Sequence, residues 1–105
     1  LIEVNIGGEK SKSGIAASGL EELVYQVSEL ENIRVRGLMA IPPAGSSERF
    51  LFDMQKLYID ISQKKIHNIS MDYLSMGMSG DYEAAIKYGA NMVRIGRGLF
   101  GPRNY

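Results

Sequence analysis

The feature that most constrains the fold is an alternation of strand-like and helix-like segments along the chain. Short apolar runs rich in β-branched residues predict strands. These runs lie at residues 1–6, 33–41, 69–76 (most strongly 73–76) and 92–95. Helical spacing of apolar residues predicts helices between them. Because strands joined by helical crossovers form parallel sheets, the order predicts an α/β fold of four βα units.

The helices are predicted from start signals and apolar stripes. Ser18 and Glu21 have the S-x-x-E spacing of a capping box, so a helix is expected to begin at Ser18. A third, shorter helix is expected at residues 81–87, with Gly89 as its terminator. The longer helix between these two carries an apolar stripe formed by Phe50, Met54, Leu57 and Ile61. Four βα units make half of a TIM-type (βα)8 barrel, and an open doubly wound sheet is the alternative.

Composition excludes several classes of function. The formal net charge is zero, so neither a nucleic-acid partner nor an anionic membrane surface is expected. The chain has no cysteine, which excludes disulfides and thiolate metal sites within these residues. His67 is the only histidine and lies in a polar stretch, where a solvated side chain is the expected reading. Without a signal peptide or a long apolar run, the protein is predicted to be cytoplasmic.

Two glycine-bearing loops indicate an anion site. Residues 92–101 read as a strand, a turn with Gly96 and Gly98, and a helix start, where unpaired backbone N–H groups can bind an anion. Residues 76–80 form a similar loop, in which Ser79 is expected to cap the following helix and to donate its hydroxyl to a phosphate. Ordinary turn and capping signals are the alternative. Because the loops follow successive strands, they predict a phosphate site together.

Arg94 lies on the strand that leads into the second loop. Strand alternation places it on the face opposite Val93 and Ile95. If that face is the barrel interior, the guanidinium needs a partner, since an unpaired buried charge is costly. The partner is predicted to be either a carboxylate such as Glu3 or an atom of a ligand.

Several motifs resemble those of the pyridoxal phosphate homeostasis proteins, whose fold is similar to the N-terminal barrel of alanine racemase. The most specific are the Leu-Ser-Met-Gly-Met-Ser block at residues 74–79 and the Val-Arg-Ile-Gly block at residues 93–96. The other matching segments are residues 4–6, 9–14, 36–42, 99–101 and Tyr105. The resemblance spans the chain and implies one domain, residues 1–105, that is the C-terminal half of a (βα)8 barrel of PLP fold-type III, with the N-terminal half absent.

The resemblance implies a binding site for pyridoxal 5′-phosphate (PLP). The phosphate is expected at Ser79 and at the turn after the last strand, through Gly96 and the backbone N–H of Arg97. Arg97 replaces a residue that is often small and hydroxylated in the family, and it could supply a charge-assisted contact instead. Arg94 is expected near the pyridine nitrogen. The remaining implied contacts are Met39, Met76 and Gly77, with core filling as the alternative for the two methionines.

The lysine that carries PLP covalently in the family lies on an early strand, and it is therefore expected upstream of Leu1. Lys10 and Lys12 occupy a polar loop with no apolar pocket to lower a lysine pKa, so neither is assigned that role.

Three functions follow as hypotheses. The first is a PLP-binding protein for intracellular vitamin B6 and amino-acid homeostasis, without robust turnover. The second is a PLP-dependent amino-acid racemase of the same fold, and the third is a phosphate-binding half-barrel unrelated to PLP. The full-length protein is expected to be a monomer, whereas a half-barrel leaves sheet edges unpaired and could self-associate.

Overall fold

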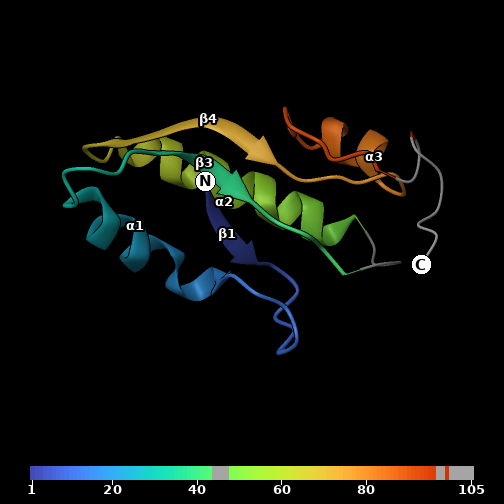
Figure 1. Ribbon diagram of the computed structural model, residues 1–105, viewed down its shortest axis with the longest axis horizontal. Helices are drawn as coiled ribbons and strands as arrows, with labels where there is room; N and C mark the ends of the chain where they lie inside the picture. Colours follow the sequence, from blue (N-terminus) through green and yellow to red (C-terminus); the bar gives the residue numbers. More distant parts are fainter. Residues whose placement is uncertain (44–47, 97–98, 100–105) are drawn as a thin grey trace.

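The computed structural model describes residues 1–43, 48–96 and 99, and all structural statements below refer to these residues. The elements run in the order β1 (Ile2–Asn5), β2 (Ile15–Ala16), η1 (Ala17–Gly19), α1 (Leu20–Ser28), β3 (Val35–Met39), α2 (Arg49–Lys64), β4 (Ile69–Ser75) and α3 (Tyr82–Lys87). The strands form one sheet in the order β2-β1-β3-β4, and every pair is parallel (Figure 1). The predicted α/β class with a parallel sheet is confirmed.

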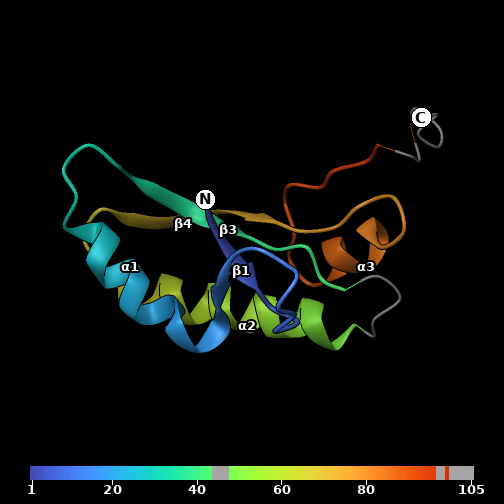
Figure 2. The same ribbon diagram turned by 60° about the horizontal axis from the view of Figure 1, so that its bottom comes forward.

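The sheet has one face covered by helices. Figure 2 shows α1 and α2 side by side on the same side of β3 and β4. Lys64 Nζ lies 3.2 Å from Glu21 Oε1, and this ion pair joins the end of α2 to the start of α1. The core lies between this helical layer and the sheet. Its fully buried large side chains are Val4, Leu20, Val24, Leu38, Met54, Leu74 and Met76.

The predicted stripe of α2 is correct in part. Met54 and Ile61 are buried, and Leu57 packs partly buried against the core. Leu51, rather than its neighbour Phe50, is the buried residue in the first turn. The reason is that the buried face of a packed helix is wider than one row of residues, so positions next to the row also reach the sheet.

β3 and β4 approach each other closely at Gly37. A Cβ placed on Gly37 would lie 1.9 Å from the carbonyl oxygen of Tyr73, so the contact requires a residue without a side chain. The strand register shifts between Val35 and Gly37, which is a β-bulge or a related irregularity. Beyond it the register is regular, with Leu38 opposite Leu74.

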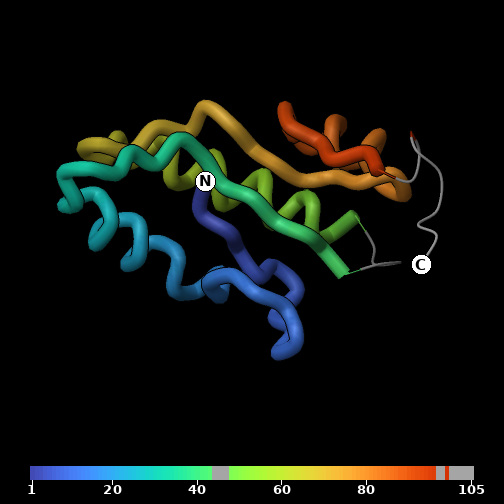
Figure 3. The backbone as a smooth tube through the Cα atoms, viewed as in Figure 1, coloured from blue at the N-terminus to red at the C-terminus, as the bar shows by residue number. Residues whose placement is uncertain are grey.

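Three details of the predicted elements are wrong. The capping box at Ser18 does not form, because a 3-10 turn precedes α1, whose N-cap is Gly19 with no side-chain hydrogen bond. The two-residue strand β2, paired with β1, lies in a stretch for which no element was predicted. The expected strand at residues 92–95 is reduced to a single parallel bridge between Met92 and Ser75. Figure 3 shows this segment running beside the end of β4.

Candidate functional site

The carboxyl ends of the parallel strands lie together at one end of the sheet, here called the rim. Backbone hydrogen bonds there connect the end of β3, the end of β4 and residues 92–94. The N–H of Ala40 donates to the carbonyl of Ser75 at 2.9 Å, and the N–H of Met76 donates to the carbonyl of Met92 at 3.1 Å. The N–H of Arg94 then donates to the carbonyl of Gly77 at 2.9 Å. The two predicted loops are therefore neighbours, as the strand order required.

Arg94 brings an unsatisfied charge to the rim. Its Nε and Nη2 atoms are buried, and neither has a hydrogen-bond partner in the part of the chain that the structure describes. These two nitrogens form one edge of the guanidinium, and each carries an N–H donor. The carboxylate predicted as a possible partner, Glu3, instead accepts a hydrogen bond from the Ser13 hydroxyl at 3.3 Å.

The face on which Arg94 lies follows from the strand register. Glu3, Met39, Ser75 and Met92 are successive partners across the sheet, so their side chains share one face. Leu38 and Leu74, one position earlier, lie in the core under the helices. By alternation Arg94 follows Met92 onto the face without helices. The unpaired donors thus belong to the side of the sheet that α1 and α2 do not cover.

The loop after β4 is shaped by Gly77 and Asp81. Gly77 is buried and has a φ of 106°, in the left-handed region that favours glycine. A Cβ there would lie 2.8 Å from the Cβ of Ala85 in α3. The Asp81 carboxylate accepts a hydrogen bond from the N–H of Met78 at 2.7 Å, which ties the loop to the start of α3.

Ser79 is not the helix cap that the sequence predicts. The N-cap residue of α3 is Asp81, whose side chain makes no capping hydrogen bond. Ser79 is partly buried and lines a hollow of about 500 Å³ between the first turns of α2 and α3. Glu48, Asp81 and Glu83 line the same hollow, and their negative charges disfavour a phosphate inside it. An anion is therefore better placed on the rim than in this hollow.

The other predicted site residues differ in their surroundings. Met39 is half-buried at the end of β3, on the face of Arg94. Met76 is fully buried within the core, which is the alternative given for it above. Gly96 is exposed, and a Cβ placed on it would have no atom of the described residues within 4 Å. Arg97, together with Gly98, lies outside the described residues.

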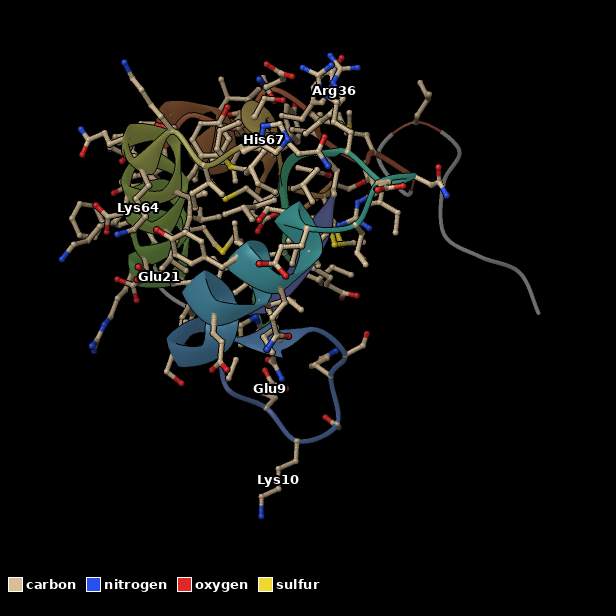
Figure 4. All side chains as sticks on the ribbon, turned by 90° about the vertical axis from the view of Figure 1, so that its left-hand side faces the viewer. Glu9, Lys10, Glu21, Arg36, Lys64 and His67 are labelled. Carbon is tan, nitrogen blue, oxygen red and sulfur yellow. The ribbon has the colours of Figure 1, made fainter. Side chains whose placement is uncertain are left out.

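Hydrogen bonds from the side chain of Asn5 hold the loop between β1 and β2, and the sequence had predicted no role for this side chain. Its Nδ2 donates to the carbonyl of Glu9 at 2.7 Å, and its Oδ1 accepts from the N–H of Glu9 at 3.2 Å. Lys10 and Lys12 in this loop are exposed, and Figure 4 shows Lys10 extending away from the rest of the molecule. An asparagine at a strand end before two glycines was the available signal, because its side chain can close a turn.

Asn91 is the second residue that the sequence did not indicate. Its side chain hydrogen-bonds to the backbone at two positions of β4, Leu74 and Asp72. It stands just before the segment that carries Arg94, on the edge of the sheet. The sequence around Asn91 does not predict these bonds, because asparagine is common in loops and its partners in β4 are distant in sequence.

Asp72 and Tyr88 are among the titratable side chains with a shifted pKa. Asp72 accepts hydrogen bonds from the Ser70 hydroxyl at 2.9 Å and from Arg36 Nε at 3.1 Å, and these bonds hold the pKa of its carboxyl below the usual value. The pKa of the Tyr88 hydroxyl is raised mainly by its hydrogen bond to Glu48 and further by burial. His67 is exposed and carries no assigned role.

Two features of the described residues concern metal binding and membrane insertion. In residues 1–43, 48–96 and 99, no group of three or more His, Cys, Asp and Glu side chains is placed to hold a metal ion. None of the helices in that same part of the chain combines the length and the apolar character that crossing a membrane requires.

Comparison with known families gives one match over nearly the whole chain. The family model described as "Alanine racemase, N-terminal domain" matches residues 1–104. Among curated proteins, the chain is similar to the pyridoxal phosphate homeostasis proteins of Aquifex aeolicus (42% identity) and Escherichia coli K12 (45% identity). Both alignments cover 100% of this chain but only 47% and 45% of the relatives, so the chain spans about half of their length.

Solved structures give the same picture. An unknown protein from Bifidobacterium adolescentis superposes with a TM-score of 0.88 at 33% identity, covering 95% of this chain and 42% of that one. PipY of Synechococcus elongatus PCC7942, solved with PLP bound, superposes with a TM-score of 0.77 at 27% identity, covering 94% of this chain and 49% of PipY.

Proposed function

The chain belongs to the alanine racemase N-terminal domain family, and on this premise we propose that it binds pyridoxal 5′-phosphate and serves PLP homeostasis. The relatives named as pyridoxal phosphate homeostasis proteins and the PLP-bound PipY structure support this proposal. Because the chain spans about half of these relatives, the role of a whole protein in vitamin B6 and amino-acid balance is part of the proposal.

The observation that carries the proposal is the unpaired edge of Arg94. Two buried N–H donors without partners among the described residues fit an acceptor supplied by a ligand. The unprotonated nitrogen of a pyridine ring is such an acceptor, and an arginine, which stays protonated, keeps it unprotonated. Bound PLP supplies an electron-withdrawing ring, and a positively charged partner of this kind limits how far the ring acts as an electron sink.

We assign the phosphate of PLP to the two loops at the rim. The open backbone at Gly96 offers space for close approach, and the backbone between Gly77 and Ser79 lies on the neighbouring loop. The Ser79 hydroxyl is the proposed side-chain donor, and its position beside an acidic hollow makes it the weaker of these contacts. A charge-assisted contact from Arg97 remains a prediction.

For the fold, we propose half of a (βα)8 barrel of PLP fold-type III. A doubly wound sheet needs helices on both faces, whereas α1 and α2 lie on one face. In the proposed barrel the face of Glu3, Met39 and Arg94 is the interior. The lysine that carries PLP covalently is still expected upstream of Leu1.

The test is an equilibrium titration of the chain with PLP, followed by absorbance and by equilibrium dialysis. Arg94→Ala removes one charge-assisted contact, which is worth about 1.5–3 kcal/mol, or roughly a ten- to hundredfold loss of affinity. Arg36→Ala is the matched control, since Arg36 is an exposed arginine on β3 that pairs with Asp72 away from the rim. It should leave the affinity for PLP unchanged.

Two further titrations separate the hypotheses. Pyridoxal, which has no phosphate, should bind more weakly than PLP but remain sensitive to Arg94→Ala. A chain that binds inorganic phosphate and sugar phosphates as well as PLP would support the phosphate-binding alternative. Equal affinity of Arg94→Ala and wild type for PLP would refute the assignment of Arg94, and racemisation of L-alanine by the PLP-saturated chain would favour the racemase.

A further inference from the structure

Asn91 stands on the edge of the sheet, between α3 and the segment that carries Arg94. Its backbone N–H donates to the carbonyl of Leu74 at 3.2 Å. Its side-chain Oδ1 accepts from the N–H of Leu74 at 2.8 Å, and its Nδ2 donates to the carbonyl of Asp72 at 2.7 Å. One exposed residue therefore makes three hydrogen bonds to the backbone of β4.

The amide of Asn91 takes the place of a missing strand. A neighbouring strand would offer β4 one carbonyl acceptor and one N–H donor, and the side-chain amide offers both. The buried N–H of Leu74 would otherwise have no acceptor on this side, and leaving a buried donor unsatisfied is costly. The ladder then continues from Met76 to Met92 and from Arg94 to Gly77 through backbone bonds alone.

We propose that Asn91 is a positioning residue for Arg94: its side-chain amide fixes the register of residues 92–94 on the edge of β4. The identity of the ligand in this inference rests on the proposed function. The register rests on hydrogen bonds between described residues. Asn91 itself is assigned no contact with PLP.

The need for such a residue follows from how weakly this segment is otherwise held. Among the described residues, an isolated bridge to Ser75 and two backbone hydrogen bonds, to Met76 and Gly77, join residues 92–94 to the end of β4 and the loop after it, so few contacts define their register. A slip of one residue would exchange the two faces of the segment. Val93, whose Cγ1 lies 3.2 Å from where a Cβ of Gly77 would be, would leave the core, and the guanidinium of Arg94 would turn toward it.

The first test does not depend on a ligand. Amide hydrogen exchange of the full chain, followed by NMR, should show Asn91→Ala lowering the protection of Leu74, Met76 and Arg94 about tenfold or more. Asn68→Gly is the matched control, because Asn68 also donates to two backbone carbonyls, those of Leu30 and Ile33, and has a φ of 65° that glycine retains. The control should leave these three amides unchanged. Unchanged protection in Asn91→Ala would overturn the inference.

The second test uses PLP affinity and a double-mutant cycle. Asn91→Ala should weaken PLP binding about tenfold in the wild-type background and less than twofold in the Arg94→Ala background. Equal losses in both backgrounds would show a structural effect that does not act through Arg94. If Asn91→Ala fails to fold, Asn91→Asp replaces it, since the carboxylate retains an acceptor for Leu74 and loses the donor to Asp72.

The two tests separate two kinds of failure. If wild type binds no PLP, the proposed function fails, and the exchange contrast between Asn91→Ala and Asn68→Gly still decides whether Asn91 holds the register. If PLP binds and Arg94→Ala weakens it, but Asn91→Ala has no effect on either readout, the positioning role alone is refuted.

Discussion

Replacing Gly77 by alanine tests how the loop after β4 supports the rim. Gly77 combines a φ of 106° with a buried position between β4 and α3, and its carbonyl accepts the hydrogen bond from Arg94. An added Cβ would lie 2.8 Å from the Cβ of Ala85 and 3.2 Å from both the Cα of Tyr82 and the Cγ1 of Val93. These neighbours belong to α3 and to the segment of Arg94, so relief of the clash must move one of the two.

The expected loss of stability has two parts. A non-glycine residue in this backbone conformation costs about 1–3 kcal/mol. The carbon–carbon distance of 2.8 Å is well inside the ordinary contact of about 3.5–4.0 Å, and overpacking of this kind costs a further 1–3 kcal/mol or so. The sum, about 2–6 kcal/mol, is a large share of the roughly 5–15 kcal/mol that stabilises a typical domain.

Thermal unfolding followed by circular dichroism measures this loss. Gly77→Ala should lower the Tm by about 8 °C or more, since 1 kcal/mol corresponds to roughly 4–8 °C in a domain of this size. Gly80→Ala is the control from the same loop, because its φ is not positive and no atom in the described part of the chain lies within 4 Å of the added Cβ. It should stay within about 0.5 kcal/mol of wild type. A Tm for Gly77→Ala equal to that of Gly80→Ala would refute the reasoning.

Two other predictions concern the core and the surface. Met54→Ala should reduce the free energy of unfolding by about 2–5 kcal/mol in urea titrations, because Met54 is fully buried. Phe52→Ala, at a side chain that is 52% exposed, should reduce it far less. Equal losses would contradict the described buried face of α2. Asp72 has a lowered pKa in the folded chain, so its ionised form stabilises the fold above the usual carboxyl pKa of about 3.9, and this contribution disappears as the pH falls through the lowered value. Asp72→Asn should therefore be slightly less stable than wild type at pH 7 and equally stable well below pH 3.9 or so in urea titrations, and a difference that persists in acid would refute the assignment.

The sequence predicted what depends on repeated patterns. Met54 and Ile61 were identified as core residues of α2, and residues 69–76 as a strand, because period and composition extend over several turns or residues there. That the two loops lie next to each other at the rim was predicted from strand order alone. These predictions needed no knowledge of individual contacts.

The predictions that failed depend on single hydrogen bonds. Ser18 and Ser79 both stand in positions typical of helix caps, yet Gly19 and Asp81 are the N-cap residues. Local capping preferences of about 1 kcal/mol are easily overridden by tertiary packing. The role of Asn91 could not be predicted, because its side-chain partners in β4 are 17 and 19 residues away in sequence. The finding that Arg94 Nε and Nη2 have no partner among the described residues also required the fold, since the sequence left Glu3 open as a partner.

The wholly parallel sheet has a consequence for how the chain folds. No two strands can pair through a tight turn, so β3 can meet β4 only after the connection containing α2 has been folded back. Non-local pairing of this kind delays folding, because the entropy of closing the connection is lost before the strand contacts form. Early formation of α2 shortens that connection and offers Met54 and Ile61 as a surface on which β4 can condense. The edge segment with Arg94 docks beside β4, so it can become ordered only after β4 has taken its place in the sheet.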